Sequence, residues 1–121
     1  MNKFALDPRL QAACIQLGRL NDCQLMLMDN AGLPWFILVP ETTATELCDL
    51  PPAVHQQLFD AANRVAVMIR EHFEVDKLNV ATLGNLVAQM HLHVIGRNRN
   101  DYCWPGGVWG PVHEQPYDEE A

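Results

Sequence analysis

The longest regular pattern of apolar and polar positions lies in the middle of the chain. Seven apolar residues recur there at spacings of three and four: Val54, Leu58, Ala61, Ala62, Val65, Met68 and Ile69. This spacing places them on one face of an α-helix of about five turns. Pro51 and Pro52 have backbone angles suited to the first turn of a helix, and no further proline or glycine occurs before Gly84. We therefore expect a long amphipathic helix that starts at these prolines and ends near Phe73.

Two apolar runs before this helix have the length of β-strands. Residues 24–28 are apolar at most positions, and residues 35–39 form a second apolar run that Pro40 closes. Between them, residues 29–32 read Asp-Asn-Ala-Gly, a composition that favours a turn. The two runs are therefore predicted to form a β-hairpin.

Two further strands are predicted after the long helix, at residues 77–83 and 87–95, joined through a turn at residues 84–85. Near the N-terminus, Pro8 lies at a first-turn position within residues 7–13, which predicts a short helix. Strands in two groups around one long helix favour an α+β domain whose antiparallel sheet is backed by helix on one face. Because such a small sheet leaves an edge exposed, we expect a homodimer in which a second copy covers it.

The length and net charge of the chain narrow the classes of function that the protein can have. The chain has 121 residues, which suits a single domain at residues 1–110 followed by an acidic tail at 111–121 that is expected to be mobile or held by a partner. The net charge of −7 argues against a nucleic-acid-binding protein, since such proteins neutralise phosphates with clustered Lys and Arg. No apolar stretch approaches the ~20 residues that span a bilayer, and the N-terminus lacks the apolar core of a signal peptide. The protein is therefore expected to be cytoplasmic, with no membrane partner.

A short alternation of polar and apolar residues carries the candidate chemistry. Gln89, His91 and His93 alternate with apolar residues, and in a strand residues two apart point to the same side. Successive side chains in such a row lie roughly 6.5 to 7 Å apart, about the span of a short polyphosphate. A neutral imidazole can attack phosphorus, and polar groups on either side would hold the target phosphate. His91, the middle residue, is therefore the candidate nucleophile.

The residues alone leave two other interpretations of this row open. A His-x-His pair on a strand is often only the polar face of a sheet. It can also hold zinc, but zinc needs one or two further ligands. His55 and His72 lie on the predicted helix and His113 in the tail, so they supply such ligands poorly. The cysteines at positions 14, 23, 48 and 103 show no Cys-x-x-Cys spacing, so we expect reduced thiols and no metal site.

The run GNLVAQMHLHVI at residues 84–95 resembles the signature of the histidine triad (HIT) family of nucleotide hydrolases and transferases. That signature is a His-x-His-x-His strand with apolar residues between, preceded by a glycine turn. The resemblance covers most of the chain and is greatest to the bacterial branch described as diadenosine polyphosphate hydrolases. It implies a five-stranded antiparallel sheet with one long and one short helix, continued across a homodimer. It also implies a covalent nucleotidyl-histidine intermediate.

The resemblance assigns roles by position in the signature. His91 matches the nucleophile, and His93 matches the last histidine, which contacts phosphate. Gln89 stands where the first histidine usually is, and glutamine keeps a donor and an acceptor but cannot carry a proton as imidazolium. Leu86 is a second departure, because many relatives have a Ser or Thr there that donates to the phosphate or leaving group. The side-chain amide of Asn85 is a candidate to replace that hydroxyl.

The same resemblance indicates nucleotide-binding positions outside the signature. Asn79 matches a residue that helps to bind phosphate or the nucleotide, and its plainer role is a hydrogen bond at a strand end. Asp29 matches the acidic residue that receives the ribose hydroxyls, although it is also a turn residue. Leu27 would then help to line the base pocket. Arg97 and Arg99 follow the predicted strand and are candidates to bring positive charge to the site.

These positions predict a nucleotide hydrolase or nucleotidyl transferase acting at the α-phosphate, with diadenosine polyphosphates or nucleoside phosphoramidates as candidate substrates. No cofactor is needed for the covalent step, and a divalent metal is expected only in company with a polyphosphate substrate. The aromatic segment at residues 102–109 is expected to pack on the dimer partner near its active site. The alternative function is nucleotide binding or sensing, in which Gln89 and Leu86 leave little catalysis.

Overall fold

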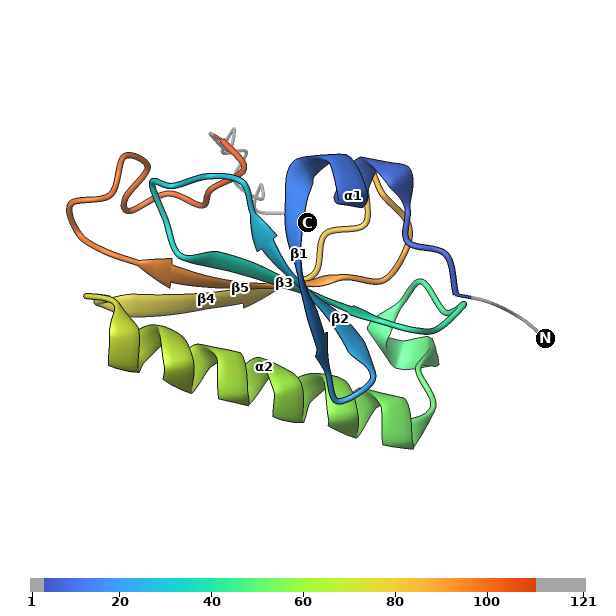
Figure 1. Cartoon of the computed structure of the whole chain (residues 1–121). Helices are drawn as coiled ribbons and strands as arrows, with labels where there is room; N and C mark the ends of the chain where they lie inside the picture. Colours follow the sequence, from blue (N-terminus) through green and yellow to red (C-terminus); the bar gives the residue numbers. More distant parts are fainter. Residues whose placement is uncertain (1–3, 111–121) are drawn as a thin grey trace, which may run out of the picture.

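A five-stranded antiparallel sheet forms the centre of the computed structural model, which describes residues 4–110. The strands are β1 (Cys14–Leu20), β2 (Cys23–Met28), β3 (Trp35–Pro40), β4 (Lys77–Ala81) and β5 (Leu92–Arg97), in the spatial order β1-β2-β3-β5-β4. Helix α2 (Pro52–His72) lies along one face of the sheet, and the short helix α1 (Pro8–Ala13) lies on the other (Figure 1). A 3₁₀ turn, η1 (Leu47–Asp49), precedes α2. The expected α+β fold, with one long and one short helix, is confirmed.

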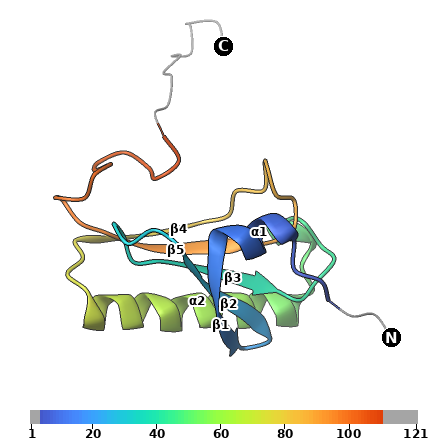
Figure 2. The same cartoon turned by 45° about the horizontal axis from the view of Figure 1, so that its top comes forward.

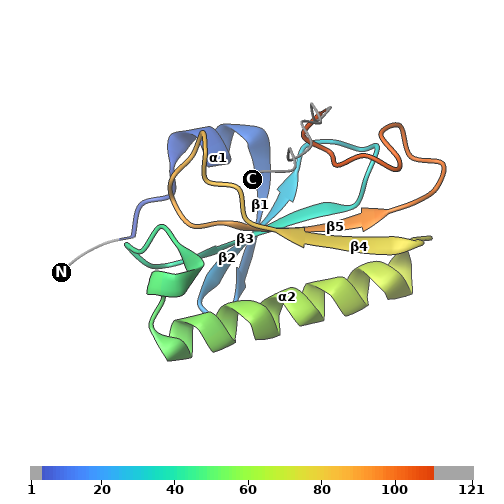
Figure 3. The ribbon, with the colours of Figure 1, turned by 180° about the vertical axis from the view of Figure 1, so that it is seen from behind.

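Helix α2 has the predicted bounds and packs through the predicted face. The buried residues of the helix are Leu58, Ala61, Ala62, Val65 and Ile69. They form one core with Phe36, Leu38, Leu92 and Val94 of the central strands. Figure 3, which views the molecule from behind, shows the helix running beneath the sheet. Gly96 of β5 permits the close approach, because a Cβ added there would lie 2.8 Å from the side chain of Ile69 in α2 and 2.7 Å from those of Pro34 and Val75.

The opposite face of the sheet carries a second apolar core. Met26, Ile37 and Ile95 point to this side, where Leu10 of α1 packs against them. Figure 2 shows α1, the segment before β5 and the segment after β5 gathered above this face. As a result, every residue of β3 and of β5 is buried.

The boundaries of the last two strands differ from the prediction. Strand β4 ends at Ala81 and β5 begins at Leu92, so residues 82–91 form a connecting loop instead of a tight turn at residues 84–85. The register pairs Leu38 of β3 with Leu92, so residue 90 would face Pro40. Proline has no N–H to donate, and the ladder therefore stops before the loop.

Strand β1 is not predicted by the apolar pattern, because it lies at an edge and five of its seven residues are exposed. All four cysteines are free thiols, as expected. Within residues 4–110 no helix is both long and apolar enough to cross a membrane. The predicted acidic tail and His113 lie outside the described residues.

Candidate active site

His91 and His93 lie together on the sheet face opposite α2. His93 pairs with Ile37, and Ile37 pairs with Met26, so these three side chains share one face. His91 is the residue just before β5, and the centroid of its ring lies 5.0 Å from the centroid of the His93 ring. Both histidines are only 4% exposed. The structure thus brings together the two predicted catalytic histidines.

The Nδ1 atom of His91 lies 2.7 Å from the main-chain carbonyl oxygen of Gln89. A carbonyl oxygen only accepts hydrogen bonds, so Nδ1 must carry the ring proton. In the neutral ring the Nε2 atom is then left with a free lone pair. This arrangement gives His91 the tautomer of a nucleophile.

His93 is held in the opposite tautomer. The indole Nε1–H of Trp35 donates to Nδ1 of His93 at 2.9 Å. Indole nitrogen only donates, so Nδ1 of His93 is unprotonated and its Nε2 carries the proton. Burial, with a smaller contribution from neighbouring His91, lowers the pKa of His93 to about 4. Near neutral pH His93 is therefore an uncharged ring whose Nε2–H can donate to an anion.

Two tryptophans that the sequence did not identify as site residues surround His93. The Trp109 ring meets the His93 ring edge-on at 4.9 Å between centroids, and Trp35 lies 5.7 Å from His93. Trp109 also meets Trp35 at 5.9 Å. The segment at residues 102–109 was expected to pack on a dimer partner, but its last residue packs on the histidine of its own chain. Its relation to a partner stays a prediction.

The side-chain amide of Gln89 is bound to the segment that precedes α1. Its side-chain Nε2 donates to the main-chain oxygen of Ala5, and its Oε1 accepts from the main-chain N–H of Asp7, both at 2.8 Å. The prediction that Gln89 and His91 belong to the last strand is wrong, because residues 89–91 precede β5. The main-chain oxygen of Gln89, and not its amide, contacts the His91 ring.

Asn79 lies on the histidine face, since it pairs with Ile95 across β4 and β5. Its Oδ1 accepts a hydrogen bond of 2.8 Å from Arg97. Arg97 is 2% exposed and forms an ion pair with Asp101 at 2.9 Å. That hydrogen-bonded pair raises the pKa of Arg97 and lowers the pKa of Asp101. Arg97 is therefore a structural residue that joins β5 to the loop after it, and Arg99 is exposed.

Asp29 and Leu27 line one cavity of about 390 Å³ at the end of β2, with Ile15, Phe36 and Phe73 among its other walls. Leu27 pairs with Phe36 and belongs to the core on the α2 side. Asp29 is exposed at the end of the strand, and Asn85 is exposed in the loop at residues 82–91. The structure thus places Leu27 on the sheet face away from the histidines.

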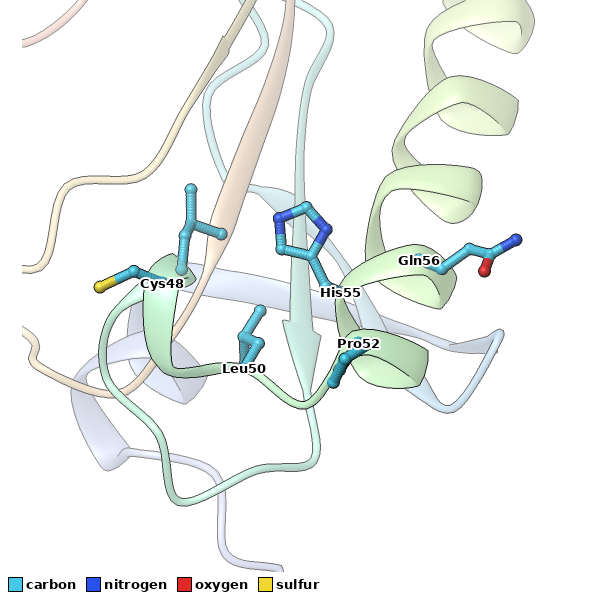
Figure 4. Close-up of a pocket in the computed structure, with 6 residues that line it drawn as sticks. Cys48, Leu50, Pro52, His55 and Gln56 are labelled. Atoms are coloured by element: carbon cyan, nitrogen blue, oxygen red, sulfur yellow. The ribbon is translucent and has the colours of Figure 1, made fainter.

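A further cavity of about 570 Å³ lies between η1 and the start of α2. None of the residues that line it was predicted as a site residue. Figure 4 shows the ring of His55 directed towards η1, whereas the thiol of Cys48 is directed away from His55. His55 stacks on Phe59, with ring centroids 4.7 Å apart. In the described part of the chain, no group of three or more His, Cys, Asp or Glu side chains is placed to hold a metal ion.

Comparisons with known proteins agree with this geometry. A HIT protein from Marinobacter aquaeolei VT8 is 41% identical, with a TM-score of 0.86 over 98% of this chain and 88% of that chain. A HIT protein from Sinorhizobium meliloti 1021 is 40% identical, with a TM-score of 0.86 over 97% of this chain and 87% of that chain. A histidine triad protein from Bradyrhizobium japonicum is 36% identical, with a TM-score of 0.85 over 97% and 88%.

No protein with a curated description matches the chain significantly. The family model of the HIT domain matches residues 9–100, which include β1 to β5, both helices except the first residue of α1, and His91 and His93. The chain therefore belongs to the histidine triad family.

Proposed function

We propose that this protein is a nucleotide hydrolase or nucleotidyl transferase that attacks the α-phosphate of its substrate with Nε2 of His91. Membership of the HIT family indicates activity of this class. The observation that carries the proposal is the pair of opposite tautomers, in which His91 presents a lone pair and His93 presents an N–H. A nucleophile and a donor for phosphate oxygen then lie on neighbouring rings.

The proposed reaction has two displacements at phosphorus. In the first, the Nε2 lone pair of His91 bonds to the α-phosphorus while the bond to the leaving group breaks, and the leaving group keeps that electron pair. The ring becomes positive, and its Nδ1–H bond to the Gln89 carbonyl stabilises this charge. In the second, a water oxygen bonds to the α-phosphorus, the electron pair of the P–N bond returns to Nε2 of His91, and the water's proton passes to solvent, which releases the nucleoside monophosphate. The Nε2–H of His93 donates to a phosphate oxygen in both steps.

The substrates we propose are diadenosine polyphosphates and nucleoside phosphoramidates, with the ribose hydroxyls bound by Asp29. The exposed carboxylate of Asp29 is free to accept two hydrogen bonds. Asp29→Ala should therefore weaken binding of a ribonucleotide much more than binding of its 2′,3′-dideoxy analogue. Equal losses for the two ligands would exclude this role.

The nucleophile is tested by trapping without acid, followed by peptide mass mapping. The wild-type protein incubated with labelled diadenosine polyphosphate, or with an adenosine phosphoramidate, should give an adenylyl adduct on the peptide that contains His91. His91→Ala should abolish both adduct and turnover, whereas His55→Ala, at an exposed position on α2, should retain both. An adduct on another residue, or full turnover in His91→Ala, would contradict the mechanism.

The second candidate function is nucleotide binding with little turnover. Leu86 favours it, because this side chain is 86% exposed in the loop before β5 and has no hydroxyl to offer a leaving group. This function predicts saturable nucleotide binding by calorimetry together with the absence of an adduct.

A further inference from the structure

The loop before β5 is held at two points by the segment that precedes and begins α1. The side-chain amide of Gln89 bonds to the main chain of Ala5 and of Asp7, each at 2.8 Å. A second point is formed by Arg9, whose Nη1 donates to the main-chain oxygen of Leu86 at 2.7 Å. We call Ala5, Asp7 and Arg9 the N-terminal clamp.

The N-terminal clamp is itself ordered by its own hydrogen bonds. The carboxylate of Asp7 accepts from the main-chain N–H of Arg9 at 2.8 Å and caps the start of α1. The same carboxylate pairs with the Arg9 guanidinium, with an Nη2 to Oδ2 distance of 3.1 Å. Arg9 is thus oriented towards Leu86 before any contact with the loop, which reduces the entropy lost in making that contact.

The other restraints on the loop are the burial of Met90 and His91 at its end, the packing of Val87 on the core, and a contact of 3.8 Å from the Thr82 hydroxyl to the Met90 sulfur. Residues 82–91 belong to no helix or strand, and Leu86 near their middle projects into solvent. Yet this loop supplies the Gln89 carbonyl oxygen that lies 2.7 Å from Nδ1 of His91. The side-chain amide that is clamped and the main-chain carbonyl that contacts Nδ1 of His91 both belong to Gln89. A rotation of the Gln89 backbone would therefore disturb both contacts.

We infer that Gln89 is a positioning residue, and that the N-terminal clamp, by holding Gln89 and Leu86 of the same loop, keeps His91 in the Nδ1–H tautomer with Nε2 free to attack. The inference rests on the proposed function for its catalytic consequence. It also explains the residue found at this position: a carboxamide offers a donor and an acceptor on one planar group, which matches the Ala5 oxygen and the Asp7 N–H.

The first test is Gln89→Met, which keeps the length of the side chain and removes both hydrogen bonds. In ¹⁵N-histidine NMR spectra of the uncomplexed protein, the wild-type His91 ring should be in the Nδ1–H form and the variant should show a mixture of tautomers. In single-turnover experiments with the labelled diadenosine polyphosphate, adduct formation at His91 should slow roughly tenfold. The Kd for adenosine monophosphate should stay unchanged, because neither bond reaches the ligand.

Arg9→Met is a second variant that cannot fail through loss of a core contact, since the Arg9 side chain is 64% exposed. It should shift the His91 tautomer in the same direction, and the double variant should lose less than the product of the two single effects, because both bonds hold one loop. Gln11→Met, the same type of change at an exposed position of α1, is the matched control and should behave as wild type.

A wild-type His91 tautomer and adduct rate in both Gln89→Met and Arg9→Met would overturn the inference. The NMR measurement keeps this result separate from failure of the proposed function. If the wild-type protein forms no adduct, the proposed function fails, while the tautomer of His91 in the variants still decides whether the clamp orients the ring.

Discussion

The hydrogen bond from Trp35 to His93 provides the most direct test of the proposed site. Trp35→Phe removes the indole N–H but keeps an aromatic ring at the start of β3. The Nδ1 atom of His93 then loses its donor, while the ring remains among the same apolar neighbours. The ring is no longer restricted to the tautomer that carries its proton on Nε2.

The size of the effect follows from the burial of His93, which is 4% exposed. Leaving a buried acceptor without a partner costs about 1–3 kcal/mol of the free energy of unfolding. If about 1.4 kcal/mol of this restricts the tautomer, then the ratio of the Nε2–H form to the Nδ1–H form should fall about tenfold, and the rate of adduct formation should fall in proportion to the fraction of molecules that keep the donor to the phosphate.

Urea unfolding, ¹⁵N NMR of the His93 ring and single-turnover kinetics measure the three consequences. Trp109→Phe is the control, because Trp109 meets the same ring only edge-on. It should change the tautomer of His93 little. An unchanged His93 tautomer in Trp35→Phe, or an equal change in Trp109→Phe, would refute the reasoning.

Three further predictions concern stability and assembly. The folded state holds the pKa of His93 near 4, below its ordinary value of 6.5, so the unfolded chain binds the proton more readily and stability falls as the pH falls between these values. Urea unfolding should show a loss of about 2 kcal/mol between pH 7 and pH 5, and a smaller loss in His93→Gln. Gly96→Ala should cost about 1–3 kcal/mol through overlap with Pro34 and Val75, whereas Gly107→Ala, with open space around it, should cost little in the same assay. Sedimentation at micromolar concentration should give a homodimer that continues the sheet through an exposed edge, and a 13.6 kDa species alone would exclude it.

The elements that the sequence predicts well are those with one buried and one exposed face. Helix α2 has such a face, so its bounds follow from apolar spacing and from the prolines at its start. Strand β1 lies at the sheet edge with mostly exposed residues, and it has no apolar alternation to detect. The start of β5 depends on Pro40, a residue far away in the sequence, and becomes visible only when the register is known.

The site shows the same limit. The spacing of His91 and His93 is visible in the sequence and identifies them as the candidate reactive rings. Trp35 is not identifiable in this way, because every residue of β3 is buried and alternation cannot show which face it occupies. The contact of Trp109 with His93 depends on the path of the loop after β5, which local sequence does not determine. The bonds of the Gln89 amide to the N-terminal segment could not be predicted either, because Ala5 and Asp7 lie far away in the sequence.

The pairing of Arg97 with Asp101 has a consequence for the anions that the proposed site would bind. The guanidinium is neutralised inside the loop, so a phosphate beside His93 meets an uncharged N–H group and no free arginine from this strand. With a formal charge of −7 on the chain, long-range attraction of polyphosphates is weak. Affinity should therefore vary less with ionic strength than at a site lined by free arginines. Such a site distinguishes between anions by the direction of its hydrogen bonds. Abundant small anions therefore do not compete with the substrate through their charge alone.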